Sequence, residues 1–307
     1  MSTRRVGYFG PAGTFTHEAV LTLGYPDDAA IALASIDEVF DAVHDGDVDL
    51  GVVPIENAIE GTVSATIDAM LFDHDLLIER EIVIPIRLHL MAKPGVAIGQ
   101  VATVRSYSHA LAQCRKFLGE HSELAADHVA STADAARQVA TGDGTDAAIA
   151  SEAAARTYGL DIIQRDVEDH PENETRFVVI GRDRIPAPTG HDRTSIVCFQ
   201  DADRPGSLYG ILGRFAARDL NLTKLESRPT KRGIGDYCFV IEFEGHLADD
   251  VVADCLADLQ AHLARVKFLG SYPVTGVEAA VRRDEVAAAR ASADAWIGSL
   301  RGKISSS

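Results

Sequence analysis

The residues best suited to chemistry gather in the stretch 173–177 (NETRF), which leads into the apolar run 178–181. It places the Thr175 hydroxyl and the Arg176 guanidinium side by side where a buried strand should begin. Burying two such groups costs free energy unless a ligand or a partner satisfies them. In open α/β sheets, ligands collect in crevices at strand ends. The stretch is therefore a candidate site, although an ordinary strand Thr beside an exposed Arg would leave the same local pattern.

A second candidate is the loop 10–16 (GPAGTFT), which joins a predicted strand over 6–9 to a predicted helix over 17–23. Glycine-rich loops of this kind let backbone N–H groups approach a ligand, and a helix N-terminus favours anions. The loop has neither the Lys-Ser/Thr ending of a phosphate-binding loop nor a GxGxxG pattern, so the sequence does not indicate a nucleotide. A tight turn with a Thr cap is the alternative interpretation.

A third candidate follows a predicted strand that Pro54 should end, because proline cannot donate a ladder hydrogen bond. Glu56 and Asn57 then lie beyond a strand end, where a polar pair can face a cleft. Thr62 or Ser64 is positioned to cap the next predicted helix. Two helix N-termini near strand ends could hold two carboxylates of a ligand. A loop carboxylate in water is the competing interpretation of Glu56.

A later part of the chain supplies further polar groups, from a predicted helix that begins near Ser106. The helix follows a predicted strand over 103–107 and carries the imidazole of His109 and the amide of Gln113. We expect these groups to lie across from the first lobe of the domain. His109 is most simply a surface or capping residue of its helix, because a lone histidine seldom indicates catalysis by itself.

The whole chain of 307 residues is long enough for two domains. Its formal net charge of −17 argues against nucleic acid or an anionic membrane as a partner, since both require a concentrated positive surface. The four cysteines lie far apart, with no CxxC pair and no His at zinc spacing, which predicts buried thiols in a reducing cytosol and no structural metal. No apolar run approaches about 18 residues, so we expect a cytoplasmic protein.

Alternating strand and helix patterns over residues 1–183 predict a two-lobed α/β domain with a cleft between the lobes, similar to the periplasmic-binding-protein architecture. A linker over 184–192, with prolines and a glycine, should end this domain. The pattern then restarts as βαββαβ over 193–273, the ferredoxin-like plan. The tail, 274–307, repeats an apolar spacing typical of a helix that helps assemble an oligomer, or of an Ala-rich surface helix.

Taken together, the motifs resemble those of prephenate dehydratases that carry a C-terminal ACT regulatory domain. The catalytic motifs of that family occur here in the same order, as GPAGTF at 10–15, PIEN at 54–57, Ser106 with Gln113, and TRF at 175–177. The segments 206–208 (GSL) and 226–229 (ESRP) look like the two signature motifs of the ACT domain. The resemblance covers roughly residues 4–273 and is specific as a set, although no single motif is.

The resemblance implies a carbon–oxygen lyase that converts prephenate to phenylpyruvate, water and carbon dioxide in phenylalanine biosynthesis, with no cofactor. It implies that Thr175 is a positioned donor to the leaving oxygen, because a hydroxyl is a poor proton source at neutral pH. Arg176 and the backbone N–H groups of the loop 10–14 would offset the substrate's charge. The residues carried over as catalytic are Thr175, Arg176, Glu56 and Asn57, and those carried over as substrate-binding are Gly13, Thr14, Ser106, Gln113 and Phe177.

Two departures from the family pattern affect this assignment. Ala58 stands where the family often has Ser, and 106–110 reads SYSHA in place of the usual Ser-His-Pro-Gln-Ala. The second departure leaves the role of His109 open between a substrate contact and a solvent-facing residue.

The ACT resemblance implies that L-phenylalanine binds between paired domains as a feedback inhibitor, and therefore a homodimer or homotetramer. Effector and substrate would then influence each other's binding reciprocally. The residues carried over to this allosteric site are Pro205, Gly206, Ser207 and Leu208 on one chain and Asn221, Leu222, Glu226, Ser227, Arg228 and Pro229 on a neighbour.

Two other functions remain open from the sequence. An arogenate dehydratase differs only in recognising an amino group in place of the side-chain keto group, and none of these motifs distinguishes the two. A non-catalytic amino-acid sensor would combine the same cleft with an ACT module, but it would have no need for a leaving-group donor at Thr175.

Overall fold

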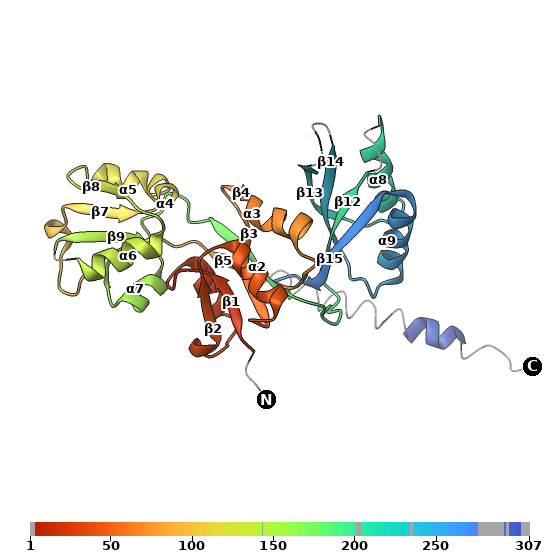
Figure 1. Ribbon diagram of the computed structural model, residues 1–307, viewed down its shortest axis with the longest axis horizontal. Coiled ribbons are helices and arrows are strands. Elements are labelled where there is room, and N and C mark those ends of the chain that lie inside the picture. Colours follow the sequence, from red (N-terminus) through yellow and green to blue (C-terminus); the bar gives the residue numbers. More distant parts are fainter. Residues whose placement is uncertain are drawn as a thin grey trace, which may run out of the picture. The chain divides into compact units, whose positions relative to one another are not determined.

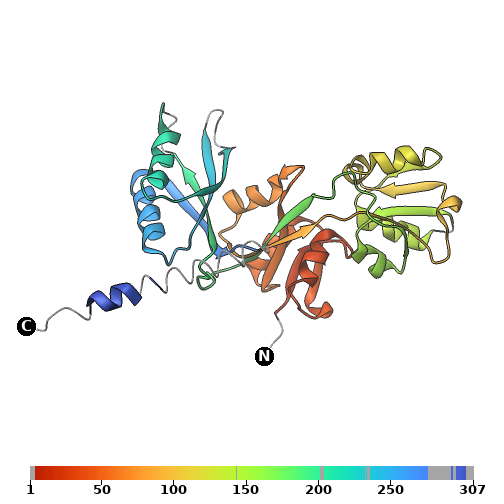
Figure 2. The ribbon, with the colours of Figure 1, turned by 180° about the vertical axis from the view of Figure 1, so that it is seen from behind.

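The computed structural model describes residues 4–142, 144–200, 204–231, 233, 236–275, 292 and 295–301 (Figures 1 and 2). The chain divides into two compact units. The first comprises the residues up to 74 together with 82–182, and the second comprises 75–81 together with the residues from 183 onward. Within the described ranges, no helix is long and apolar enough to cross a membrane.

The first lobe of the first unit is built on a mixed sheet with the strand order β2-β1-β3-β11-β5, and β4 pairs with β3. Strand β1 runs parallel to β2 and β3, whereas β11 returns from much later in the sequence and runs antiparallel to β3. The elements are β1 (Val6–Phe9), α1 (Phe15–Leu21), β2 (Ala30–Leu33), α2 (Ile36–Asp45), β3 (Leu50–Asn57), β4 (Gly61–Thr62), α3 (Ser64–Asp68), β5 (Leu77–Pro85) and β11 (Glu174–Gly181).

The second lobe has a five-stranded sheet in the order β10-β6-β9-β7-β8. Strand β7 runs parallel to both neighbours, and β6 runs antiparallel to β9 and β10. Alanines of α6 and α7 allow these helices to pack closely on the sheet. The elements are β6 (His89–Ala92), β7 (Thr103–Ser106), α4 (Ser108–Ala112), α5 (Arg115–Glu120), β8 (Ala125–His128), α6 (Thr132–Thr141), β9 (Asp146–Ala150), α7 (Glu152–Tyr158) and β10 (Asp161–Gln164).

The second unit is a four-stranded antiparallel sheet in the order β13-β14-β12-β15, with both helices on one face (Figure 1). Phe215 of α8 and Leu259 of α9 pack in one core cluster with Phe243 of the sheet. The elements are β12 (Asp192–Phe199), α8 (Ser207–Ala216), β13 (Leu222–Pro229), β14 (Tyr237–Glu244), α9 (Asp250–His262) and β15 (Arg265–Pro273). The predicted combination of a two-lobed α/β domain and a ferredoxin-like βαββαβ domain is confirmed.

Pro54 does not end its strand as predicted, because β3 continues through it to Asn57. Pro54 pairs with Phe177 of β11 at a shift in the register of the two strands. A bulge is one of the places in a sheet where a missing N–H is tolerated. The prediction was wrong because this bulge depends on a partner strand that lies far away in the sequence.

The predicted cap of the following helix is also absent. Helix α3 begins after Val63, whose side chain cannot accept a hydrogen bond, so neither Thr62 nor Ser64 is the N-cap residue. The helix has only five residues before it passes into a π-helical turn over Ala69–Asp73. It therefore offers no extended helix N-terminus for a carboxylate.

The sequence also led to predictions for the four cysteines and for the C-terminal tail. All four cysteines are free and buried, as expected. Of the predicted apolar seam of the tail, Trp296 and Leu300 lie in the helical segment 295–301 and are exposed, at 62% and 40%. Val286, Ala289 and Ala293 lie outside the described residues.

Candidate active site

Thr175 lies opposite Asn57, where β11 pairs with the end of β3. Alternate residues of a strand face opposite sides of a sheet, so Thr175 shares a face with Phe177 and Arg176 shares the other face with Ile180. Phe177 belongs to the core cluster that contains the buried side of α1, whereas Ile180 meets α2 across a glycine of β3. The Thr175 hydroxyl is therefore on the α1 side of the sheet and the Arg176 guanidinium on the α2 side.

The side chain of Asn57 holds the Thr175 hydroxyl in a defined orientation. Its Oδ1 accepts the backbone N–H groups of Ile59 and Glu60, each at 3.0 Å, and this fixes which end of the amide is oxygen. Its Nδ2 lies 2.8 Å from Thr175 Oγ1 and 3.0 Å from Asn173 Oδ1. Because an amide nitrogen only donates, Thr175 Oγ1 accepts in this contact and can donate its own proton elsewhere.

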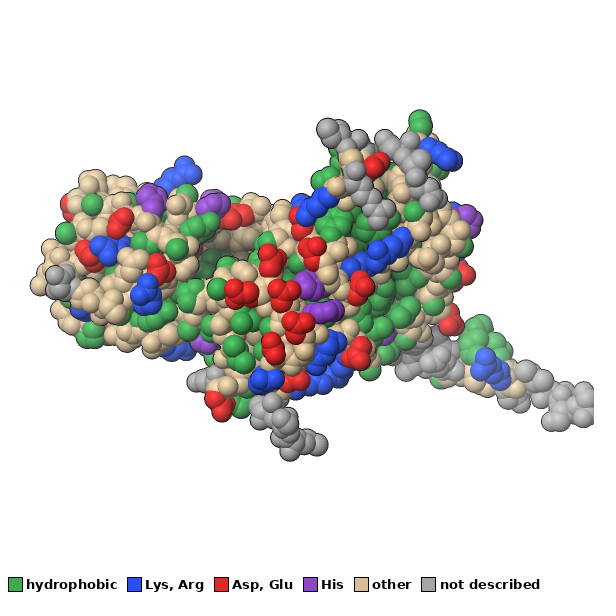
Figure 3. All heavy atoms as spheres, in the orientation of Figure 1, with side chains coloured by type: hydrophobic (Ala, Val, Ile, Leu, Met, Phe, Trp, Pro, Cys, Tyr) green, Lys and Arg blue, Asp and Glu red, His purple; other side chains and the backbone are tan. Residues whose placement is uncertain are grey.

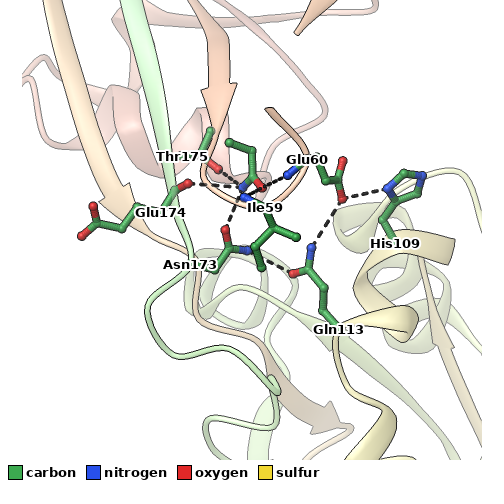
Figure 4. Close-up of polar contacts among 8 residues, drawn as sticks. Ile59, Glu60, His109, Gln113, Asn173, Glu174 and Thr175 are labelled. Atoms are coloured by element: carbon green, nitrogen blue, oxygen red, sulfur yellow. Dashed lines mark hydrogen bonds and ion pairs between the residues drawn. The ribbon is translucent and has the colours of Figure 1, made fainter. Parts of the chain in front are cut away.

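The polar network continues from the first lobe into the second (Figure 4). Asn173 Nδ2 donates to Gln113 Oε1 at 3.1 Å, and Gln113 Nε2 donates to Glu60 Oε1 at 3.4 Å. His109 Nδ1 lies 2.7 Å from the same Glu60 oxygen. The space-filling view shows a hollow between the two lobes, with histidine and acidic side chains beside it (Figure 3). The network thus joins α4 of one lobe to the ends of β3 and β11 of the other.

Burial in this network increases from the rim toward Thr175. The side chains of His109 and Glu60 are 55% and 43% exposed, whereas Asn173 is 1% exposed and Thr175 8%. A hydrogen bond between buried polar groups is costly to break without replacement. The inner amides are therefore held more firmly than the rim pair.

Arg176 forms an ion pair with Glu56 at 2.8 Å between Nη2 and Oε2. The two residues are directly opposite each other in the β3–β11 register, next to the bulge. Since Arg176 already faces a carboxylate, its charge is largely balanced within the protein. A role for this pair in offsetting substrate charge stays a prediction.

The loop that carries Gly13 and Thr14 joins the two lobes. Ser151 Oγ donates to the Gly13 carbonyl at 2.9 Å, and Tyr158 Oη donates to the Ala12 carbonyl at 2.8 Å. The Gly13 N–H donates to His17 Nδ1 at 3.1 Å, within the same loop and helix. Several polar groups of this loop are therefore already hydrogen-bonded within the protein. Thr14 caps α1, as in the alternative interpretation of this loop as a turn with a Thr cap.

Gly13 is expected to tolerate no side chain. Its φ is +86°, and a Cβ atom there would lie 3.0 Å from Ala154 Cα and 3.2 Å from the Tyr158 ring. Gly13→Ala should lower the free energy of unfolding by roughly 2 kcal/mol through left-handed strain and overpacking, as measured by urea denaturation. Gly24→Ala is the matched control, because Gly24 has φ +72° with nothing within 4 Å. Equal effects of the two substitutions would refute the close interlobe contact.

Two tyrosines beside this loop stay uncharged at neutral pH. Burial, together with the nearby Tyr158, raises the pKa of Tyr8 to about 12. Burial likewise raises the pKa of Tyr158. Tyr8 stacks on the His17 ring with 5.0 Å between centroids. These phenols are therefore packing and hydrogen-bonding groups of the lobe junction, not bases.

Two residues predicted to bind substrate lie inside the protein instead. Ser106 is fully buried and its Oγ donates to the Ile149 carbonyl at 2.6 Å, so it links β7 to β9. Phe177 is 1% exposed in the core of the first lobe. Neither side chain is placed on a surface that a ligand can reach. Asn57, Gln113 and Thr175, in contrast, belong to one polar network, and their roles toward a substrate stay a prediction.

Sequence patterns placed Asn173 in the candidate stretch 173–177 but assigned it no role, and they did not indicate Glu60. Asn173 stands two residues before Thr175, and Glu60 stands three residues after Asn57. Both could have been suspected from that proximity, but their partners come from the second lobe. Among the described residues, no group of three His, Cys, Asp or Glu side chains could hold a metal ion.

A separate open groove of about 570 Å³ lies on the second lobe, lined by the turn 95–97, α7 and β10. None of the predicted site residues lines it. Glu152 and Arg165 in this groove form an ion pair at 3.3 Å.

The residues predicted for the allosteric site are all accessible in the second unit. Gly206 has φ +86° and precedes α8, and Ser207 Oγ donates to the Arg204 carbonyl at 2.8 Å. Strand β13 is at the edge of its sheet and alternates between half-buried and exposed residues. The residues in question, none of them buried, are Pro205, Gly206, Ser207, Leu208, Asn221, Leu222, Glu226, Ser227, Arg228 and Pro229.

Comparisons with known proteins agree with the fold. A family model described as prephenate dehydratase matches residues 6–185, and one described as the ACT domain matches residues 194–261. The prephenate dehydratase of Amycolatopsis methanolica is 40% identical over 271 residues, which cover 87% of this chain and 88% of that one.

Two solved structures share the fold over most of the chain. That of prephenate dehydratase from Arthrobacter aurescens in complex with L-Phe has a TM-score of 0.80 at 36% identity, and covers 97% of this chain and 99% of its own. GqqA, described as a novel type of quorum quenching acylase, has a TM-score of 0.82 at 29% identity, over 90% of this chain and 100% of its own. Because a family model matches more than half of the chain and the curated relative extends over nearly all of it, the protein belongs to the prephenate dehydratase family and carries an ACT domain.

Proposed function

We propose that the protein is a prephenate dehydratase, which converts prephenate to phenylpyruvate, and that L-phenylalanine inhibits it through the ACT domain. The observation that carries the catalytic part is the orientation of Thr175. Its Oγ1 accepts from Asn57 Nδ2 at 2.8 Å, so its own proton can be directed to a ligand. A hydroxyl that is oriented before the substrate binds costs little reorganisation at the moment of reaction.

The reaction requires the protein to bind the substrate and to supply one hydrogen-bond donor. The ring carboxylate leaves as carbon dioxide, and the electron pair of the broken carbon–carbon bond becomes part of the new aromatic ring. The ring hydroxyl departs and takes up one proton, so that it leaves as water. Thr175 assists by donating a hydrogen bond to the departing oxygen, while solvent supplies the net proton. No electron acceptor or donor is required.

In this proposal Glu56 and Arg176 stabilise the pairing of two strands and do not contact the substrate. Their ion pair clamps β3 to β11 directly beside the bulge that positions Thr175 and Asn57. Removing Glu56 would take this carboxylate away from the Arg176 guanidinium, whose side chain is only 10% exposed.

Strand β5 is the element through which we expect the ACT domain to influence Thr175. Its early part belongs to the second unit, where Glu81 is 1% exposed and accepts from Arg193 Nη1 at 2.7 Å. Its later part belongs to the first unit, where Ile82 and Ile84 share a core cluster with Phe177.

The chain just beyond β5 reaches the polar network itself. The Ile86 N–H donates to the Asn173 carbonyl at 2.8 Å, and Asn173 contacts the amide that orients Thr175. A shift of this strand would therefore alter the position of Asn173. Such an element, which both sites can bias, is what coupling between two ligands requires.

The assembly we propose is a homodimer or homotetramer formed through the second unit. Strand β13 is the edge strand of its sheet, and an edge strand is where a strand of a second copy can be added. The exposed Tyr237 of β14 and Leu225 of β13 would be covered by a second copy. Light scattering of the purified protein measures this assembly directly.

Phenylpyruvate formation from prephenate by the full chain, with and without L-phenylalanine, tests the proposal. We expect turnover that falls as L-phenylalanine is added. Turnover with arogenate but not prephenate would make the protein an arogenate dehydratase. Absence of turnover with either substrate, together with phenylalanine binding in calorimetry, would identify a sensor. Turnover that does not change when L-phenylalanine is added would refute only the regulatory part of the proposal.

A further inference from the structure

We propose that Glu60 is a positioning residue of this site, which acts through Gln113 on the amides that orient Thr175. The inference rests on the proposed function, since Thr175 is the group whose orientation matters.

Glu60 closes a ring of hydrogen bonds that spans the two lobes (Figure 4). Its backbone N–H donates to Asn57 Oδ1 at 3.0 Å, and its carboxylate accepts from Gln113 Nε2 at 3.4 Å. Between these ends, Asn57 Nδ2 donates to Asn173 Oδ1 at 3.0 Å, and Asn173 Nδ2 donates to Gln113 Oε1 at 3.1 Å. Each of the three side-chain amides in this ring therefore accepts a hydrogen bond through its oxygen from one neighbour and donates one through its nitrogen to the other neighbour.

The Glu60 carboxylate sets the direction of this ring at Gln113, and the backbone N–H groups of Ile59 and Glu60 set it at Asn57. A carboxylate only accepts, so Gln113 must turn its NH₂ group toward Glu60 and its oxygen toward Asn173. Asn173 must then turn its own NH₂ toward Gln113 and its oxygen toward Asn57. Asn57, whose oxygen is held by the backbone N–H groups, presents its NH₂ both to this Asn173 oxygen and to Thr175, whose hydroxyl proton is left for a ligand. Without the Glu60 carboxylate, Gln113 could rotate by half a turn and offer an NH₂ group to Asn173 in place of its oxygen.

His109 holds the carboxylate in place, which gives this histidine a role that the sequence left open. Its Nδ1 is 2.7 Å from Glu60 Oε1, and since the carboxylate only accepts, Nδ1 carries the proton. The His109 ring stacks on Tyr107 with 5.1 Å between centroids and 8° between planes. This stacking restricts the ring to the orientation that faces Glu60.

The position of Glu60 separates its effect on catalysis from any effect on folding. Its side chain is 43% exposed, so its removal leaves no unpaired charge in the core. Exposed pairs of this kind contribute little to stability. A substitution of Glu60 should therefore change turnover while leaving the unfolding temperature nearly unchanged.

Steady-state kinetics with prephenate tests the proposal on the full chain and on Glu60→Ala, Glu60→Gln, Gln113→Ala and the Glu60→Ala/Gln113→Ala double variant. We expect Glu60→Ala to lower kcat roughly tenfold with KM changed less than about twofold, the pattern of an interaction that matters in the transition state. Glu60→Gln should restore most of the activity, because the Gln oxygen still accepts from Gln113. On the Gln113→Ala background, Glu60→Ala should cost less than about twofold.

Glu123→Ala is the matched control, because Glu123 is an exposed carboxylate that, like Glu60, pairs with a histidine, in this case His121 at 3.3 Å within the second lobe. It should leave kcat unchanged. The proposal is overturned if Glu60→Ala behaves like Glu123→Ala, or if the effects of Glu60→Ala and Gln113→Ala on kcat multiply. Lack of turnover in the unmodified protein would instead refute the proposed function, so the two failures are distinguishable.

Discussion

Replacing Thr175 by Val should lower kcat for prephenate by a factor of roughly 10²–10⁴, the range that a positioned proton or hydrogen-bond donor contributes. Val keeps the shape of the side chain and removes the hydroxyl, so packing on the α1 face of the sheet is retained. Asn57 Nδ2 loses one acceptor at 2.8 Å but keeps Asn173 Oδ1 at 3.0 Å. We therefore expect KM to change little and the fold to persist.

Thr175→Ser supplies the control, because it restores the hydroxyl and removes only a methyl group. It should recover activity to within about tenfold of the unmodified protein, as expected if the donor and not the methyl matters. Activity of Thr175→Val above a tenth of the original value would contradict the assignment of Thr175 as the leaving-group donor. Circular dichroism of each variant would verify that the comparison is between folded proteins.

Gly270→Ala should separate regulation from catalysis and destabilise the second unit. Gly270 has φ +146°, and a Cβ atom there would lie 2.5 Å from the Ile78 carbonyl oxygen of β5. Backbone strain and overpacking each cost on the order of 1–3 kcal/mol, so we expect a loss of about 3 kcal/mol. The early part of β5 must move away from β15 to relieve the clash, and inhibition by L-phenylalanine should weaken.

Hydrogen exchange of the segments 75–81 and 265–273 measures the local loss, alongside inhibition curves for L-phenylalanine. Turnover without the effector should persist at an altered rate, because Thr175 and its amides belong to the first unit while the chain beyond β5 contacts Asn173 through Ile86. Gly95→Ala is the control, since Gly95 has φ +83° with nothing within 4 Å and tests strain without a clash. Inhibition by L-phenylalanine that is unaltered in Gly270→Ala, despite faster exchange of β5, would show that this strand does not transmit the signal.

Local sequence patterns were sufficient for most of the secondary structure. The strand predicted over 6–9 and the βαββαβ order predicted over 193–273 appear where the pattern indicated. These features depend on residues a few positions apart, so a short window contains the physics that produces them. The motifs likewise predicted roles for Thr175, Asn57 and Gln113, whose side chains lie in one polar network.

What the sequence by itself determined is the order of two domains and the residue types that the family's chemistry uses. The tertiary structure decided which of those side chains meet. Ser106 is buried against Ile149 because β7 and β9 are neighbours, and Pro54 stays inside its strand because β11 shifts register beside it. Glu60 and Asn173 join the site only because the second lobe brings Gln113 to them. Each of these contacts links residues that are far apart along the chain, and their pairing depends on how whole sheets and lobes pack, which no local pattern contains.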